Sequence, residues 1–151
     1  MRRVFWLFLF ITRPLTLDAC DNTFLIIKSK DSEITIEVEI ADSYLKRKQG
    51  LMFREHLNIT SGMLFTYDYP QKVGFWMKNT KIPLDIAFAD SRGTVVQVVY
   101  DTKPFSLDII DGGENIQYVL EINAGVAEQL QLFEGSKLVH PFINKRIKYP
   151  C

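Results

Sequence analysis

The sequence contains few of the residues on which metal and redox sites depend. It has two cysteines and two histidines in 151 residues. Cys20 and Cys151 form no Cys-X-X-Cys pair, and His56 and His140 are isolated from cysteine and carboxylate clusters. Zinc sites and thioredoxin-type centres need such clusters. The sequence therefore predicts no metal and no cofactor.

An excess of charge of one sign is also absent. Lys plus Arg and Asp plus Glu number 18 each, which gives a formal net charge of zero. Proteins that bind nucleic acid generally carry a basic excess or a basic stripe. The short cluster Lys46-Arg47-Lys48 is typical of a solvated helix surface. We therefore expect no nucleic-acid partner.

Motifs of the common enzyme classes are missing as well. There is no Gly-X-Ser-X-Gly motif, which carries the nucleophile of α/β-hydrolases. Nor does a glycine-rich loop lead into a helix, because Gly112 and Gly113 precede Glu114, whose carboxylate would repel a phosphate. An enzyme is therefore the less favoured interpretation.

No apolar run is long enough to cross a bilayer, but the N-terminus resembles an export signal. Arg2 and Arg3 precede the apolar residues 4–11, and a basic start before a short apolar core is typical of secretory signals. The sequence Leu17-Asp18-Ala19-Cys20 resembles a bacterial lipoprotein processing site, in which Cys20 would carry lipid. We expect residues 1–20 to be such a leader, and the protein to be exported to the periplasm, cell envelope or extracellular space. The alternatives are an apolar N-terminal strand and a misassigned start codon.

Export would leave three states open for the two cysteines. Cys20 and Cys151 could pair, Cys20 could carry lipid while Cys151 stays free, or both thiols could be idle. A disulfide between them would close a long loop and could stabilise the fold by ~4 kcal/mol.

Residues 21–151 are predicted to form a single, mainly β domain. Residues 33–40 alternate strictly between aliphatic and polar side chains, as in a strand with one exposed face. Further strands are expected at short intervals, over residues 23–29, 62–67, 73–78, 84–90, 94–100 and 116–122. This spacing favours a compact antiparallel β-sandwich or a partly closed barrel.

One or two short helices complete the predicted domain. The fold class is therefore mainly β, on the border with α+β. Asp42 or Ser43 can cap a helix over residues 44–49, and Asn123 can cap a second helix over residues 124–133.

Three of the predicted strands place polar side chains beside apolar ones. Because side chains alternate along a strand, Asp85 faces the same side as two small alanines, and Glu121 lies opposite the bulky face of its strand. A third strand carries Trp76 and Lys78 on one side, and Asn79 directly follows its end. Whether these groups converge in space does not follow from the pattern.

Five blocks in this order resemble the signature of the domain of unknown function 192 (DUF192) family. They are Gly50-Leu51-Met52-Phe53-Arg54, Gly62-Met63-Leu64-Phe65, Phe75-Trp76-Met77-Lys78-Asn79-Thr80, Ile82-Pro83-Leu84-Asp85-Ile86 and Tyr118-Val119-Leu120-Glu121-Ile122-Asn123-Ala124-Gly125. The resemblance covers residues 24–139. It implies a compact, mainly β fold with a small helical element, and it implies no established reaction.

Each candidate residue has both a structural and a functional interpretation. Arg54 could clamp a carboxylate or phosphate, but a buried pair with Asp85 or Glu121 is favoured, because partly buried charges need partners. Asp85 and Glu121 could instead act as acid and base, although ion-pair networks commonly contain such carboxylates. Trp76 could stack against a sugar ring, or lie in the core.

The preferred hypothesis is an exported envelope or extracytoplasmic binding or accessory domain. Its ligand would be a small molecule, a glycan or an envelope protein, and it would touch the membrane only through a lipid anchor or an uncleaved leader. The candidate ligand-binding residues are Arg54, Trp76, Lys78, Asn79, Asp85 and Glu121. The rival hypothesis is a small hydrolase that uses Asp85 or Glu121 as acid or base.

Overall fold

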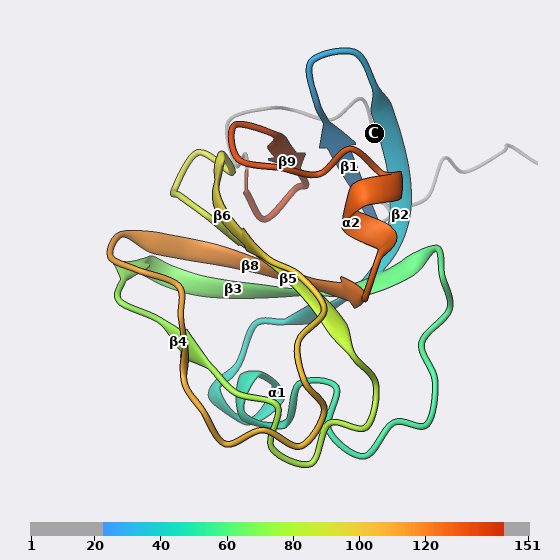
Figure 1. The fold of residues 1–151 in the computed structure, drawn as a ribbon. Coiled ribbons are helices and arrows are strands. Elements are labelled where there is room, and N and C mark those ends of the chain that lie inside the picture. The colour runs from blue at the N-terminus through green and yellow to red at the C-terminus, as the bar shows by residue number, and fades with distance from the viewer. Residues whose placement is uncertain (1–22, 144–151) are drawn as a thin grey trace, which may run out of the picture.

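A curled seven-stranded sheet dominates the computed structural model, which describes residues 23–143 (Figure 1). In chain order the elements are β1 (Phe24–Lys28), β2 (Glu33–Ala41), α1 (Tyr44–Gln49), β3 (Ser61–Gln71), β4 (Gly74–Phe75), β5 (Leu84–Ala89), β6 (Val95–Val99), β7 (Ile110–Asp111), β8 (Ile116–Asn123), α2 (Val126–Gln129) and β9 (Lys137–Val139). The large sheet has the order β6-β5-β8-β3-β2-β1-β9, and β4 and β7 form a separate pair. The prediction of a mainly β fold, curled like part of a barrel and with two short helices, is confirmed. The predicted leader and both cysteines lie outside the described residues.

One strand pair departs from the antiparallel arrangement. β2 and β3 run parallel, with Glu37 opposite Ser61 and Ala41 opposite Phe65. Parallel neighbours need a long crossover, and here α1 and the residues after it supply it. The other paired strands are antiparallel.

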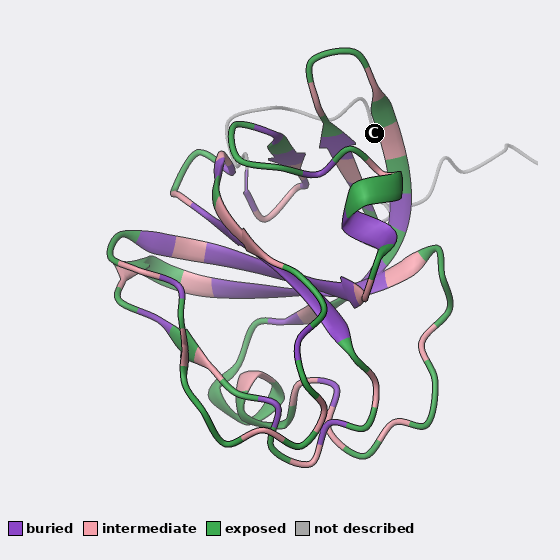
Figure 2. Ribbon diagram, viewed as in Figure 1, coloured by how far each residue is buried: buried purple, intermediate pink, exposed green. Residues whose placement is uncertain are grey.

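The sheet carries a hydrophobic core on each face. The core on the α2 side includes Leu25 and Leu138, and the core on the α1 side includes Phe65, Met77 and Phe88. The central strands β3, β5 and β8 are accordingly the most deeply buried (Figure 2). α1 itself buries no residue completely, so it is held to the fold mainly by the chain on either side of it.

β5 shows the predicted alternation of faces. Leu84, Ile86 and Phe88 point into the α1-side core, and Ala87 and Ala89 point into the α2-side core. Because both faces are covered, every residue of β5 is buried.

Two predicted elements are shorter in the structure. The strand expected over residues 73–78 is limited to β4, which pairs with β7, and the chain turns after Phe75. The second helix is limited to α2, because the left-handed Gly125 (φ 79°) precedes it and Gln131 is left-handed (φ 53°) soon after its end.

Asn123 is not the cap of α2. Gly125 occupies the N-cap position, and the side-chain amide of Asn123 instead donates to the carbonyls of Leu57 (3.0 Å) and Asn58 (3.1 Å). Asn123 therefore fastens the end of β8 to the chain that leads into β3.

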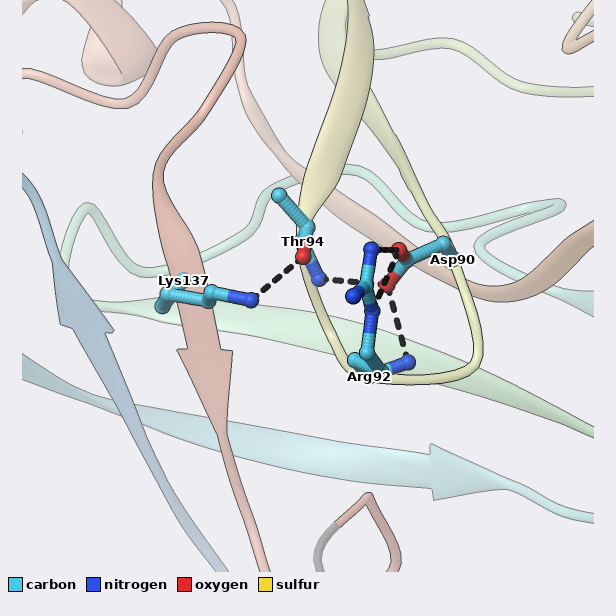
Figure 3. A network of polar contacts seen from close by, with 4 residues as sticks. All are labelled: Asp90, Arg92, Thr94 and Lys137. Carbon is cyan, nitrogen blue, oxygen red and sulfur yellow. Dashed lines mark hydrogen bonds and ion pairs between the residues drawn. The ribbon is translucent and has the colours of Figure 1, made fainter.

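A hairpin turn joins the antiparallel strands β5 and β6, and Figure 3 shows how it closes. The Asp90 carboxylate accepts the backbone amides of Arg92 and Thr94, each at 2.8 Å. Lys137 Nζ donates to Thr94 Oγ1 and so joins β9 to the turn. The cluster braces the turn by satisfying its backbone amides.

α1 and the loops after β4 and β6 gather at the end of the molecule opposite α2, at the bottom of Figure 1. We call residues 44–56, 76–81 and 101–109 the loop end. Within residues 23–143, no helix has the length and apolar character needed to cross a membrane.

Candidate functional site

The turn after β4 is held rigidly against the loop after β6. The Met77 amide donates to the carbonyl of Ser106 (3.1 Å), and the Phe105 amide donates to the carbonyl of Thr80 (3.1 Å). The buried Thr102 hydroxyl lies 3.3 Å from Sδ of Met77 and donates to the carbonyl of Leu84 at 2.8 Å. These contacts fix the segment that contains Trp76, Lys78 and Asn79.

A second turn, after α1, is joined to the first. The Phe53 amide donates to the carbonyl of Asn79 at 2.8 Å. Phe53 (φ 67°) and Asn79 (φ 56°) both have left-handed backbones. This conformation is unfavourable for a bulky residue such as phenylalanine, whose side chain is nevertheless 64% exposed. The fold thus holds a large aromatic ring in solvent on a strained backbone.

An open groove of about 770 Å³ lies between α1 and these two turns. Its lining consists of Leu45, Lys48, Gln49, Met52, Phe53, Trp76, Lys78 and Asn79. Lys78 Nζ lies 5.0 Å from the centre of the exposed Trp76 ring, in a cation–π contact. The lining combines apolar and aromatic side chains with two cations and contains no acidic residue.

Comparing glycine with alanine at position 53 tests whether the left-handed backbone of Phe53 is strained. Glycine adopts φ 67° without steric cost, so we expect Phe53→Gly to raise the free energy of unfolding by about 0.5 kcal/mol relative to Phe53→Ala, despite glycine's larger unfolded-state entropy. Urea denaturation of both variants measures the difference. A Phe53→Gly protein less stable than Phe53→Ala would show that the left-handed backbone is unstrained.

The expected pair between Arg54 and Asp85 or Glu121 does not form. Arg54 instead makes a two-pronged ion pair with Glu39, in which NH2 lies 2.7 Å from Oε2. These hydrogen bonds hold the pKa of Glu39 below its usual value of 4.5. Arg54 lines a neighbouring pocket of about 540 Å³, beside the groove but not part of its wall.

Asp85 is engaged with the backbone on the α2 side of the sheet. The residue is 1% exposed, and its Oδ1 accepts the amide of Asp101 while Oδ2 accepts the amide of Ala127, each at 2.9 Å. Because Gly125 provides no side-chain cap for α2, the Asp85 carboxylate satisfies one of the free amides of that helix. Both oxygens are therefore used in holding the fold together.

Glu121 lies on the opposite face, between Met63 of β3 and Ile86 of β5. It is 5% exposed, and its Oε2 is buried without a hydrogen-bond partner among the described residues. Burial raises the pKa of Glu121 to about 8, so the carboxyl group is largely protonated at neutral pH.

The two carboxylates cannot form one acid–base pair. Asp85 lies opposite Ile122 in the register of β5 and β8, and Ile86 lies opposite Glu121, so the two side chains point to opposite faces. No group of three or more His, Cys, Asp or Glu residues is placed to hold a metal within residues 23–143.

Of the six candidate residues, the structure brings Trp76, Lys78 and Asn79 together in one groove. It places Arg54 beside that groove and Asp85 in a separate cavity next to α2, and Glu121 is buried and does not line the groove. The sequence did not point to Phe53 or Lys48 as part of the site. The one signal for Phe53 was that it adjoins the candidate Arg54 in a recognisable block.

Residues 25–140 match the family of domain of unknown function 192, described as uncharacterized ACR. The chain belongs to the DUF192 family. A UPF0127 protein of Pyrococcus abyssi is 29% identical over 113 residues, which cover 67% of this chain and 92% of the relative. A UPF0127 protein of Pyrococcus furiosus is 28% identical over 115 residues, with coverages of 73% and 91%.

Two solved structures share the fold of this DUF192 chain. A protein of Sinorhizobium meliloti, described as a putative transcription regulator, has a TM-score of 0.76 and 36% identity, over 78% of this chain and 92% of its own. A protein of unknown function from Novosphingobium aromaticivorans has a TM-score of 0.74 and 30% identity, with coverages of 77% and 83%. The chain therefore shares its fold with both proteins.

Proposed function

We propose that this DUF192 protein is an exported binding domain whose groove takes a ligand with an anionic group and an apolar or flat body. The observation that supports this most strongly is the composition of the groove. Trp76 and Phe53 offer exposed aromatic surface, and Lys48 and Lys78 offer positive charge without an acidic neighbour in the lining. Ligand sites typically combine apolar walls with a few polar groups that fix orientation.

Strain at the groove supports the same interpretation. Phe53 keeps a large exposed ring on a left-handed backbone, an arrangement that costs stability. Such costs concentrate at functional sites, where the geometry serves binding rather than folding.

Export is proposed on the sequence of the N-terminus. Arg2 and Arg3 before the apolar residues 4–11 are typical of a secretory signal, and Cys20 would be the lipid acceptor in a lipoprotein-type leader. In such a setting the ligand would come from the cell envelope or the extracellular space.

The rival hydrolase hypothesis gains no support from the carboxylates. Both Asp85 oxygens already accept backbone amides, and Glu121 is buried on the other face of the sheet. A mechanism that places one carboxylate on each side of a substrate needs both in the same cleft.

Fluorescence of Trp76 provides a direct test of groove binding. The chain has two tryptophans, so Trp6→Phe leaves Trp76 as the only one. We expect decanoate to shift the Trp76 emission to shorter wavelength and to saturate. Decanol, which has the same apolar body without the charge, should bind at least about tenfold more weakly.

Lys78→Met provides the matched side-chain control. It keeps an unbranched apolar chain beside Trp76 and removes the charge, so it should weaken decanoate binding about tenfold and leave decanol binding unchanged. Equal affinity for decanoate and decanol in the wild-type groove, or no change of emission with either, would contradict the proposal.

A further inference from the structure

A strip of exposed apolar side chains lies beside the groove. Phe105, Leu107 and Ile109 occupy alternate positions of the loop after β6, and their exposures are 59%, 66% and 67%. Phe105 has a left-handed backbone (φ 61°), as Phe53 does. None of the three belongs to the groove lining.

The strip is fixed against the segment that carries Trp76. Ile109 packs so closely over Gly74 that a Cβ built there would lie 2.9 Å from Ile109 Cγ2. The Met77 amide donates to the carbonyl of Ser106, in the middle of the strip. The exposed apolar side chains of both loops are therefore presented together on an ordered scaffold.

The loop end as a whole concentrates exposed apolar residues. Seven of the thirteen exposed large hydrophobic residues of the described chain lie there: Tyr44, Leu45, Phe53, Trp76, Phe105, Leu107 and Ile109. Monomeric proteins rarely expose apolar side chains in such a group unless it contacts a partner.

Positive charge is concentrated at the same end. Within residues 23–143, seven of the twelve Lys and Arg residues lie at the loop end, but only three of the sixteen Asp and Glu residues do. The loop end thus has a formal charge of +4, and the rest of the described chain −8. Two of its cations, Lys46 and Arg54, pair with Asp42 and Glu39 just outside it, and the loop end still carries +2 when these two partners are counted with it. Lys48, Lys78 and Lys103 form no ion pair with a described residue. The balanced total charge hides this separation.

We propose that the loop end docks on a membrane surface that contains anionic phospholipid. Phe105, Leu107 and Ile109 enter the headgroup region, and the unpaired lysines lie against lipid phosphates. Aromatic and aliphatic side chains mixed with lysine are the composition of peripheral membrane-binding surfaces. Membrane docking is a separate proposal from ligand binding, because it does not require a small molecule in the groove.

A membrane fits these side chains better than a protein partner does. Protein–protein interfaces are enriched in aromatic residues but depleted in lysine, because desolvating an ammonium group is costly. At a bilayer the long lysine side chain keeps its charge among the headgroups while its methylenes cover apolar surface. The acidic residue within the strip, Asp108, accepts a hydrogen bond from the Ser106 hydroxyl at 3.0 Å.

Vesicle sedimentation of the full-length chain tests the proposal. We expect binding to vesicles of mixed phosphatidylcholine and phosphatidylglycerol, with much weaker binding to phosphatidylcholine alone and weakening as salt is added. Leu107→Ser/Ile109→Ser should lower the partition coefficient at least about tenfold. Tyr69→Ser, which changes an equally exposed side chain outside the loop end, should leave it unchanged. All variants keep residues 1–22, so a difference in partition coefficient between them arises from the substituted residues of the domain and not from the N-terminal segment.

A second variant, which removes two positive charges and no apolar side chain, tests the electrostatic part of the proposal separately. Lys78→Gln/Lys103→Gln should weaken binding to the anionic vesicles about tenfold or more and leave binding to phosphatidylcholine unchanged. Equal binding of wild type and Leu107→Ser/Ile109→Ser would overturn the proposal. So would a wild-type chain that fails to bind anionic vesicles, whether or not it binds an acidic peptide or duplex DNA. Failure of decanoate to bind the groove leaves this prediction unaffected.

Discussion

Asp85→Ala is expected to lower the free energy of unfolding by about 3–5 kcal/mol, a large loss for a single substitution. The carboxylate is buried, and its two oxygens accept the amides of Asp101 and Ala127 at 2.9 Å. A hydrogen bond to a charged group contributes about 1.5–3 kcal/mol, and the substitution leaves both amides without their acceptor. α2 and the loop after β6 would lose their common anchor.

Urea denaturation measures this loss, with two variants as controls. Asp85→Asn retains one acceptor oxygen and should cost roughly half as much as Asp85→Ala. Asp108→Ala removes an exposed aspartate whose partner is the Ser106 hydroxyl, and should change stability by less than about 0.5 kcal/mol. A loss below about 1 kcal/mol in Asp85→Ala would indicate that water or another group satisfies the amides.

Glu121 is expected to make the fold less stable as pH rises from about 5 to 8. Burial raises its folded-state pKa to about 8, whereas its usual value is 4.5. Below pH 4.5 both states carry the proton, and between these values only the folded state does. Unfolding then releases a proton, so the free energy of unfolding falls with pH by up to about 1.4 kcal/mol per unit, and by on the order of 4 kcal/mol in total.

Comparison of wild type with Glu121→Gln isolates this effect. The amide is close in shape to the protonated carboxyl group but does not titrate, so the two proteins should have similar stability at pH 5 and Glu121→Gln should be several kcal/mol more stable at pH 9. Glu37→Gln, on the exposed side of β2, should show the pH dependence of wild type. If the free energy of unfolding depended on pH in the same way in wild type and in Glu121→Gln, the pKa of Glu121 would not be raised in the folded state.

Local pattern predicted much of the fold because the strands are regular. The alternation of β2 and β5 placed side chains on the correct faces, and Ser43, which accepts the Lys46 amide, marks the start of α1. Elements that depend on single turns were harder to predict. β4 ends early because the chain must turn at Trp76 to meet the loop after β6, a contact over about thirty residues.

The partners of the charged residues depended on tertiary structure. Arg54 lies on the crossover between β2 and β3 and pairs there with Glu39 of β2, and the parallel pairing that this crossover serves leaves no trace in the local sequence. The opposite orientations of Asp85 and Glu121 follow from a one-residue offset in the register of β5 and β8. Sequence alternation cannot supply that register, so it could not separate the two carboxylates.

The exposed aromatic residues of the groove were the least predictable feature. Phenylalanine and tryptophan are usually buried, and a core position was the structural alternative for Trp76. Exposure of Phe53 follows from its left-handed backbone and its hydrogen bond to Asn79, both of which are products of the completed fold.

The most direct measurement is an amide chemical-shift map of the full-length chain titrated with decanoate. If the groove is the binding site, shifts should concentrate at the amides of Phe53, Trp76 and Asn79, and leave those of Asp101 and Ala127 unchanged. Shifts concentrated instead around the cavity of about 560 Å³ that adjoins Asp85 and α2 would contradict the account, because the ligand would then bind in a cavity that shares no lining residue with the groove.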